Sequence, residues 1–225
     1  MVKAILFDLD DTLYDEKTYV VSGFWAVAEE LEVELQTPQG QLAEEMLAIL
    51  ADDGRGRVFD VLLKRYGAYS NKRVEEMVEV YRAHQPDITL FPDVFRVLGG
   101  LQESNYLLGL VTNGLCIMQK RKVEALGIKP YMDAVVYPDK LGSDLWKPNP
   151  AGFRECLEQL GVPPEHAVYV GNDPEKDLEP SRKIGMIPVQ MCRSELGTSR
   201  SEEADTHVAD MDELARILQS HQKNE

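Results

Sequence analysis

Two aspartates separated by one residue, Asp8 and Asp10, directly follow a short apolar run, Ala4–Phe7. Carboxylates at this spacing, leaving the end of a strand, can hold one hard cation between them, and Mg²⁺ favours a few carboxylate oxygens together with water and phosphate oxygens. The same spacing lets one carboxylate attack phosphorus while the other protonates the leaving oxygen. A polar loop after a strand produces such a pair too, so the pair alone leaves both interpretations open.

A second apolar run, Leu107–Val111, ends in Thr112, Asn113 and Gly114, and a helix-like stretch follows. The threonine hydroxyl, the neighbouring backbone amides and the N-terminus of a helix together offer a place for an anion. A plain turn with a capping residue explains the same letters. The motif therefore predicts anion binding only in combination with others.

Lys147 stands between Trp146 and Pro148, shortly before a helix that we expect to start near Pro150. The prolines stiffen the approach to that helix. A lysine held there can neutralise both a carboxylate nucleophile and a phosphoryl oxygen, although most lysines are simply solvated.

A second acidic cluster, with Asn172, Asp173 and Asp177, follows Gly171 at the end of another apolar run. Asp173 is a candidate third metal ligand. Asp177 lies one helical turn further on and could support either the metal or Lys147. Acids that cap a helix at a strand-to-helix turn are the alternative explanation.

Five apolar runs have the pattern of strands that are buried on both faces of a parallel sheet. They are Ala4–Phe7, Leu107–Val111, Ala134–Tyr137, Ala167–Val170 and Ile187–Met191. The helix-like stretches between them are Met118–Leu126, Ala151–Leu160 and Leu178–Ile184. This alternation predicts right-handed crossovers and an α/β fold with a doubly wound parallel sheet.

Residues 14–85 interrupt the alternation, because they show only helical periodicity. One of their apolar faces comprises Phe24, Val27, Ala28, Leu31 and Leu35. We therefore expect a helical bundle over 14–85, inserted into a core made of 1–13 and 86–225. The polar residues Ser220–Glu225 are expected to be frayed.

The composition excludes several classes of protein. A net charge of −15 gives a surface that repels nucleic acid and anionic lipid. Cys116, Cys156 and Cys192 lie far apart, without the spacing of a zinc site or a disulfide framework. The first apolar stretch is interrupted by Asp8 and is too short for a signal peptide or a membrane span, so we expect a cytoplasmic protein.

The four motifs follow one another along the chain in the order acid pair, Thr-Asn, Lys-Pro and acid cluster. With this order of motifs, the chain resembles the haloacid dehalogenase-like superfamily. This large group consists mostly of phosphatases with a Rossmann-like core and an inserted cap domain, and the resemblance extends over nearly the whole chain. It implies an Mg²⁺-dependent hydrolase that acts on a small phosphorylated metabolite through an aspartyl-phosphate intermediate.

The resemblance also implies roles for individual residues. Asp8 corresponds to the nucleophile and Asp10 to the general acid/base, and the Asp8 side chain and the Asp10 backbone carbonyl also bind Mg²⁺. Thr112 corresponds to the phosphate-binding hydroxyl, and Asn113 beside it is expected to help hold the phosphoryl group. Lys147 corresponds to the lysine that offsets charge in the transition state.

The last motif matches less closely. Asp173 corresponds to the metal-binding acid and Asp177 to a supporting acid. Asn172 stands where many members carry an acid, which leaves the choice between Asp173 and Asp177 less secure, and we favour Asp173. Leu9 and Gly114 are expected to complete the phosphate-binding residues.

The helical insertion resembles the first cap type of the family, which closes over the site, excludes water and supplies substrate contacts. The candidate contacts are Lys17, Arg55, Arg57 and Lys64. Each of these cations also fits a solvated surface position.

Three other functions stay open at this stage. A dehalogenase of the superfamily works without metal and typically lacks the second aspartate, so Asp10 counts against it. A sugar phosphomutase uses the same acids and differs chiefly in how the cap protects the phosphoenzyme from water. An inactive phosphate-binding or scaffold protein would have lost catalytic residues that are all present here. Neither the physiological substrate nor the oligomeric state follows from the sequence.

Overall fold

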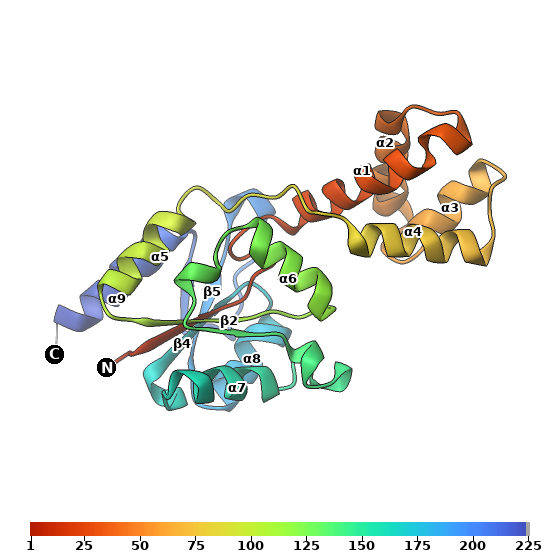
Figure 1. Cartoon of the computed structure of the whole chain (residues 1–225). Coiled ribbons are helices and arrows are strands. Elements are labelled where there is room, and N and C mark those ends of the chain that lie inside the picture. Colours follow the sequence, from red (N-terminus) through yellow and green to blue (C-terminus); the bar gives the residue numbers. More distant parts are fainter. Residues whose placement is uncertain (224–225) are drawn as a thin grey trace. The chain divides into compact units, whose positions relative to one another are not determined.

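The computed structural model describes residues 1–223, which form two compact units (Figure 1). The core unit joins Met1–Asp15 to the described residues from Thr89 onward, and the helical unit consists of Glu16–Ile88. Tyr14 and Asp15, which the sequence assigned to the insertion, belong to the core unit. Residues 86–88 belong to the helical unit instead of the core.

The core unit is built on a parallel sheet of six strands in the order β3-β2-β1-β4-β5-β6. The strands are β1 (Ala4–Phe7), β2 (Leu107–Val111), β3 (Ala134–Val136), β4 (Ala167–Gly171), β5 (Ile187–Met191) and β6 (Thr206–Val208). The chain builds outward from β1 to β3 on one side and then from β4 to β6 on the other. The direction reverses between β1 and β4, and in sheets of this kind ligands bind at the carboxyl ends of the strands beside that point.

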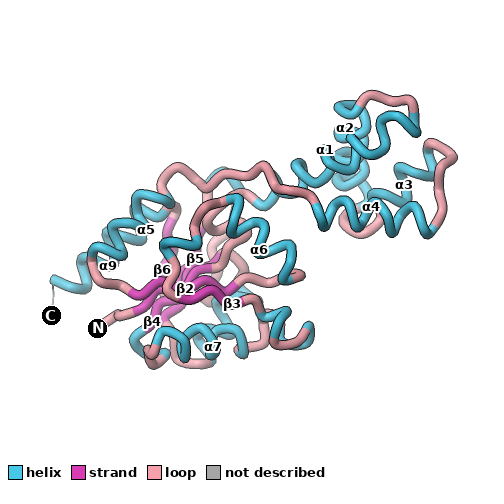
Figure 2. Tube along the Cα trace, in the orientation of Figure 1, coloured by secondary structure: helices cyan, strands magenta, loops and turns pink. Residues whose placement is uncertain are grey.

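Helices cover both faces of the sheet, as Figure 2 shows with the strands in magenta. α5 (Val94–Glu103), α6 (Cys116–Ala125) and α9 (Met211–Lys223) lie on one face, and α7 (Ala151–Leu160) and α8 (Glu179–Lys183) lie on the other. Because both faces are covered, all four residues of β1 are buried. The doubly wound α/β architecture predicted from the sequence is confirmed.

Short helical turns connect these elements. They are η1 (Lys129–Tyr131), η2 (Pro138–Lys140), η3 (Ser143–Leu145), η4 (Pro164–His166), η5 (Pro174–Leu178, a π-helical turn) and η6 (Ser194–Leu196). The stretch Leu178–Ile184, expected as one helix, is thus divided between the end of η5 and α8.

The sequence missed β6 and the helices α5 and α9. β6 has only three residues, and only Val208 is buried, so its apolar signal is weak. α9 continues to Lys223, so a helix occupies the first part of the stretch from Ser220 that was expected to be frayed. Residues 224 and 225 lie outside the described part of the chain.

The helical unit contains α1 (Glu16–Leu35), α2 (Gln39–Asp53), α3 (Val58–Arg65) and α4 (Asn71–Ala83). Its core includes Phe24, Val27, Leu31, Met46 and Leu62, and Leu35 packs against it while partly buried. These residues recur at helical spacing, which explains why each helix buries one face. None of the helices within residues 1–223 is long and apolar enough to cross a membrane.

The candidate cations Arg55 and Lys64 contact side chains within this unit. Arg55 donates two hydrogen bonds to the Glu16 carboxylate, at 3.0 and 2.6 Å. Lys64 places its ammonium 4.4 Å from the centre of the Tyr69 ring. Arg57 precedes α3 at its N-terminus.

The strand β2 approaches α7 so closely that Gly109 has no room for a side chain. A Cβ atom there would lie 2.5 Å from Cys156 Sγ and 3.0 Å from Leu6 Cγ. We expect Gly109→Ala to lower the free energy of unfolding by about 1–3 kcal/mol, because the added methyl overpacks a closed core. Urea unfolding measures the difference.

The matched control is Gly100→Ala in α5, where a Cβ meets nothing within 4 Å. It should stabilise the protein by up to about 1 kcal/mol, because alanine favours helix over glycine. Equal stability of the two variants would contradict the close packing of β2 on α7.

Candidate active site

The carboxyl end of β1 carries Asp8, which is 7% exposed. Its backbone N–H donates to the Val170 carbonyl at 2.9 Å, so the pairing of β1 with β4 continues into the acidic motif. This backbone bond fixes the Asp8 side chain at the point where the strand order reverses. Asp8 therefore occupies the place at which this fold binds ligands.

Lys147 is buried and donates to three oxygen atoms. Its ammonium lies 2.5 Å from Asp8 Oδ1, 2.7 Å from Asp177 Oδ1 and 3.1 Å from the Tyr169 hydroxyl. Three acceptors match the three donors of an ammonium group. Burial opposes the charge, but the charges of Asp177 and Asp8 outweigh it and raise the pKa of Lys147 above its usual range. Lys147 is therefore a fixed cation beside Asp8.

Asp177 is completely buried and anchors Lys147 from the far side. Its Oδ2 accepts a hydrogen bond from the Asp173 backbone N–H at 3.1 Å. Gly171 at the end of β4 makes this position accessible, since a Cβ there would lie 2.5 Å from Asp177 Oδ2. The sequence left two roles open for Asp177, support of the metal and support of Lys147. The contact with Lys147 is present in the structure.

Asn113 holds the backbone of Lys147. Its Nδ2 donates to the Lys147 carbonyl at 2.9 Å, and its Oδ1 accepts from the Lys147 N–H at 2.8 Å. Both ends of the amide are used, so in this structure Asn113 positions Lys147. The sequence analysis expected Asn113 to help hold the phosphoryl group.

The chain turns sharply after Asp10, with Asp11 at a φ of 56°, a left-handed conformation that aspartate tolerates better than most residues. This turn brings Tyr14 back, and its hydroxyl donates to Asp10 Oδ1. Lys122 Nζ donates to the same oxygen at 2.7 Å, and Gln119 Nε2 donates to Asp10 Oδ2 at 3.3 Å. Asp10 therefore has three partners, one from the loop after β1 and two from α6.

Thr112 is buried at the end of β2, and its hydroxyl donates to Gln119 Oε1 at 3.2 Å. Gly114 has a φ of 121°, and a Cβ there would lie 2.6 Å from Gln119 Nε2, so the loop needs glycine at this point. Leu9, between the two acids, is fully buried, and its carbonyl accepts the Leu13 N–H at 3.0 Å.

Asp173 stands at the start of η5. Its Oδ1 accepts the backbone N–H groups of Glu175 and Lys176, each at 3.0 Å, and its Oδ2 pairs with Lys176 Nζ at 2.6 Å. Burial alone would raise the pKa of Asp173, but these hydrogen bonds and the charge of Lys176 outweigh it and hold the pKa below its usual range. The Asn172 carbonyl accepts a hydrogen bond from Gln190 at 3.3 Å.

The structure thus links the predicted residues into two groups. Asp8, Lys147, Asp177 and Asn113 are joined by direct hydrogen bonds, and Asp173 reaches this group through its backbone. Asp10 and Thr112 are joined through Gln119. Within residues 1–223, no three or more His, Cys, Asp or Glu side chains are grouped so that they could hold a metal ion on their own.

The sequence reasoning missed four residues of the site: Tyr14, Gln119, Lys122 and Tyr169. Gln119 and Lys122 are three residues apart on α6 and are as buried as Val123 beside them. A polar pair at helical spacing among apolar positions was the available signal. Tyr169 gave none, because an aromatic residue is ordinary in a buried strand.

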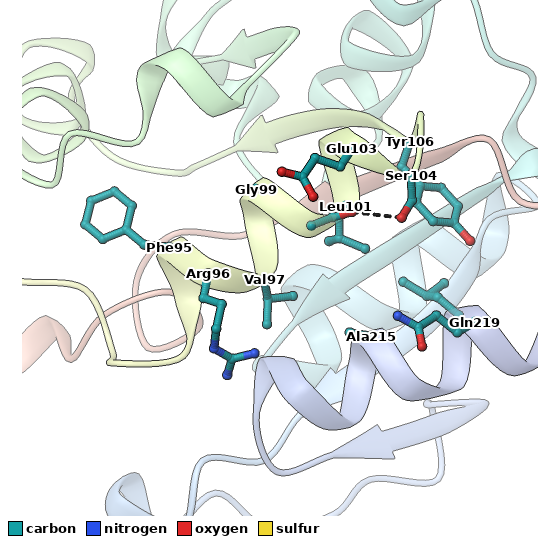
Figure 3. A pocket seen from close by; sticks show the side chains of 12 residues that line it. Phe95, Arg96, Val97, Gly99, Leu101, Glu103, Ser104, Tyr106, Ala215 and Gln219 are labelled. Carbon is teal, nitrogen blue, oxygen red and sulfur yellow. Dashed lines mark hydrogen bonds between the residues drawn. The ribbon is translucent and has the colours of Figure 1, made fainter.

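A hollow of about 500 Å³ between α5 and α9 is not this site (Figure 3). None of the predicted catalytic, phosphate-binding or metal-binding residues lines it. Its charged groups are Glu103 and Arg96, and Arg96 already pairs with Asp212 at 2.6 Å.

Comparison with known proteins points to one family. The model of the haloacid dehalogenase-like hydrolases matches residues 5–190. The chain is 36% identical over 200 residues to the glyceraldehyde 3-phosphate phosphatase of Methanopyrus kandleri, covering 86% of this chain and 85% of the relative. It is 31% identical over 232 residues to the glyceraldehyde 3-phosphate phosphatase of Methanocaldococcus jannaschii, with 100% of both chains covered.

A solved structure agrees with these relatives. The crystal structure of a HAD phosphatase from Thermococcus onnurineus superposes with a TM-score of 0.67 and is 27% identical. The match covers 96% of this chain and 98% of that protein.

Burial raises the pKa of Asp8 from 3.8 to about 7, and the charges of Asp177 and Asp10 add to this effect against the opposing charge of Lys147. Because the pKa is higher in the folded chain, ionising Asp8 destabilises the fold as the pH rises from about 4 to 7. Without divalent metal, Asp8→Asn should therefore raise the free energy of unfolding by about 1–3 kcal/mol at pH 8 and by clearly less at pH 5.

Thermal unfolding in a chelator at both pH values measures this difference. Asp144→Asn is the control, since Asp144 is an exposed acid of the same unit and should change stability by less than about 0.5 kcal/mol. A destabilising effect of Asp8→Asn at pH 8 would contradict the electrostatics of the site.

Proposed function

This chain belongs to the phosphatase branch of the haloacid dehalogenase-like hydrolase family, and we propose that it hydrolyses small phosphomonoesters through an aspartyl-phosphate formed at Asp8. The observation that carries this proposal is the environment of the Asp8 carboxylate. Lys147 binds Oδ1 at 2.5 Å, whereas Oδ2 accepts no hydrogen bond from the residues that the structure describes. One oxygen is therefore fixed, and the other is available as a nucleophile.

In the first half of the reaction, Asp8 Oδ2 forms a bond to phosphorus while the bond from phosphorus to the substrate alcohol breaks. Asp10 gives a proton to the departing oxygen. Lys147 offsets the negative charge that spreads over the phosphoryl oxygens, and Thr112 is the proposed hydrogen-bond donor to one of them.

In the second half, water attacks the phosphorus of the aspartyl-phosphate and releases inorganic phosphate. Asp10, now ionised, takes the proton of that water. The Asp8 carboxylate is restored and pairs again with Lys147. One residue thus acts first as an acid and then as a base.

We propose Mg²⁺ as the cofactor, because the donors offered here are hard oxygens. Asp8, the backbone carbonyl of Asp10 and Asp173 would hold it, with water and a phosphate oxygen completing the shell. Mg²⁺ keeps several of its waters, so a small number of carboxylates is enough to hold it. Residues 1–223 contain no larger cluster of candidate ligands. When bound, the ion supplies positive charge that polarises the phosphoryl group.

The relatives suggest the substrate to test first. The two relatives described above are named glyceraldehyde 3-phosphate phosphatases, and we propose glyceraldehyde 3-phosphate as the lead candidate in a panel of small phosphorylated metabolites. We also propose that the helical unit acts as a cap domain and that the enzyme works in the cytoplasm. The net charge of −15 disfavours nucleic acid as a partner.

The direct test is release of phosphate from glyceraldehyde 3-phosphate and from p-nitrophenyl phosphate, with Mg²⁺ and with chelator. Asp8→Asn and Lys147→Met should each lower kcat by about 10³-fold or more, because one removes the nucleophile and the other the charge beside it. Lys140→Met, at an exposed lysine seven positions earlier, should keep wild-type activity. Wild-type activity in Asp8→Asn would refute the proposed nucleophile.

A second test separates the two acids of the last motif. Asp173→Asn should raise the Mg²⁺ concentration for half-maximal activity about 10-fold or more, because it removes a proposed ligand. Asp177→Asn should instead lower kcat at saturating Mg²⁺, because Lys147 loses its anchor at 2.7 Å. The reverse pattern would assign the metal to Asp177.

A further inference from the structure

The inner face of α6 carries two buried polar side chains. Gln119 is 4% exposed and Lys122 is 2% exposed, and the two are three residues apart on the helix. A buried ammonium is costly unless it is paired, so Lys122 needs an acceptor within the core unit. One acceptor is the proposed general acid/base, Asp10, 112 positions earlier in the sequence.

The bonds to Asp10 are not shared equally between its oxygens. Oδ1 accepts from Lys122 Nζ at 2.7 Å and also from the Tyr14 hydroxyl. Oδ2 accepts only from Gln119 Nε2, at 3.3 Å, among the described residues. A carboxylate oxygen has two lone pairs, so Oδ1 is saturated and Oδ2 keeps one lone pair for a proton.

Gln119 also connects Asp10 to the loop after β2. Its Nε2 donates to the Asn113 carbonyl at 2.6 Å, and its Oε1 accepts from the Thr112 hydroxyl at 3.2 Å. One side chain therefore touches the acid/base, the proposed phosphate-binding hydroxyl and the residue that holds Lys147. Together, Gln119 and Lys122 fix the loop after β1 against the loop after β2.

We propose that Lys122, with Gln119 and Tyr14, is a positioning residue that orients Asp10 so that Oδ2 exchanges the proton with the leaving alcohol. This inference rests on the proposed function. In the first half-reaction, the proton on Oδ2 passes to the oxygen whose bond to phosphorus breaks. In this proposal Lys122 acts on the reaction through Asp10 and not by contact with the substrate.

The test compares two substrates that differ in how much they need an acid. The alkoxide leaving from glyceraldehyde 3-phosphate needs a proton, whereas p-nitrophenolate is stable without one. Lys122→Met keeps the length and apolar stem of the side chain but removes the ammonium. It should lower kcat/KM for glyceraldehyde 3-phosphate about 100-fold and for p-nitrophenyl phosphate less than about 5-fold, since kcat/KM reports the first half-reaction.

Lys120→Met is the matched control, because Lys120 is an exposed lysine on the same helix. It should leave both values unchanged. Equal losses for both substrates in Lys122→Met, or no loss, would overturn the inference. If the wild type hydrolysed neither of the two substrates, the proposed function would be overturned instead.

A second variant decides the matter if Lys122→Met does not fold. Tyr14→Phe removes one hydroxyl from a fully buried ring and keeps its packing. It should lower kcat/KM about 5- to 10-fold for glyceraldehyde 3-phosphate and leave p-nitrophenyl phosphate within about 2-fold. Equal effects on the two substrates would contradict the positioning of Asp10.

Discussion

The site depends on one buried ammonium, that of Lys147, held between the carboxylates of Asp8 and Asp177. This ammonium donates to both carboxylates and to the Tyr169 hydroxyl, and moving it away from Asp8 would break this set of bonds. The interaction therefore fixes one oxygen of the proposed nucleophile and places a positive charge beside it.

The topology of the sheet brings these groups together. Asp8 follows β1, Asn113 follows β2 and Asp177 follows β4, and these three strands are neighbours in the sheet. Since all strands are parallel, their carboxyl ends share one edge, where residues more than 100 positions apart in the chain come into contact. Close approaches at Gly109 and Gly171 allow the packing and the buried acid that this arrangement requires.

The sequence predicted the elements well where burial is complete. β1 is a four-residue apolar run buried on both faces, and the proposed nucleophile, Asp8, directly follows it. Prediction failed where the signal depends on tertiary contacts. In β6 only one of the three residues is buried, so the apolar signal is weak. Lys122 has the sequence signal of a surface cation, and only the packing of α6 brings it to Asp10. The role of Asn113 was equally invisible, because its partner is the backbone of Lys147, 34 positions away.

The most direct test of the account is to trap the covalent intermediate. Borohydride reduces an acyl phosphate but leaves a free carboxylate intact, so quenching the enzyme during turnover with borohydride should convert residue 8 into homoserine. We predict that peptide mass spectrometry finds this change at Asp8 and nowhere else, and only when substrate and Mg²⁺ are present. Modification at another residue, or none in an enzyme that is turning over, would contradict nucleophilic attack by Asp8.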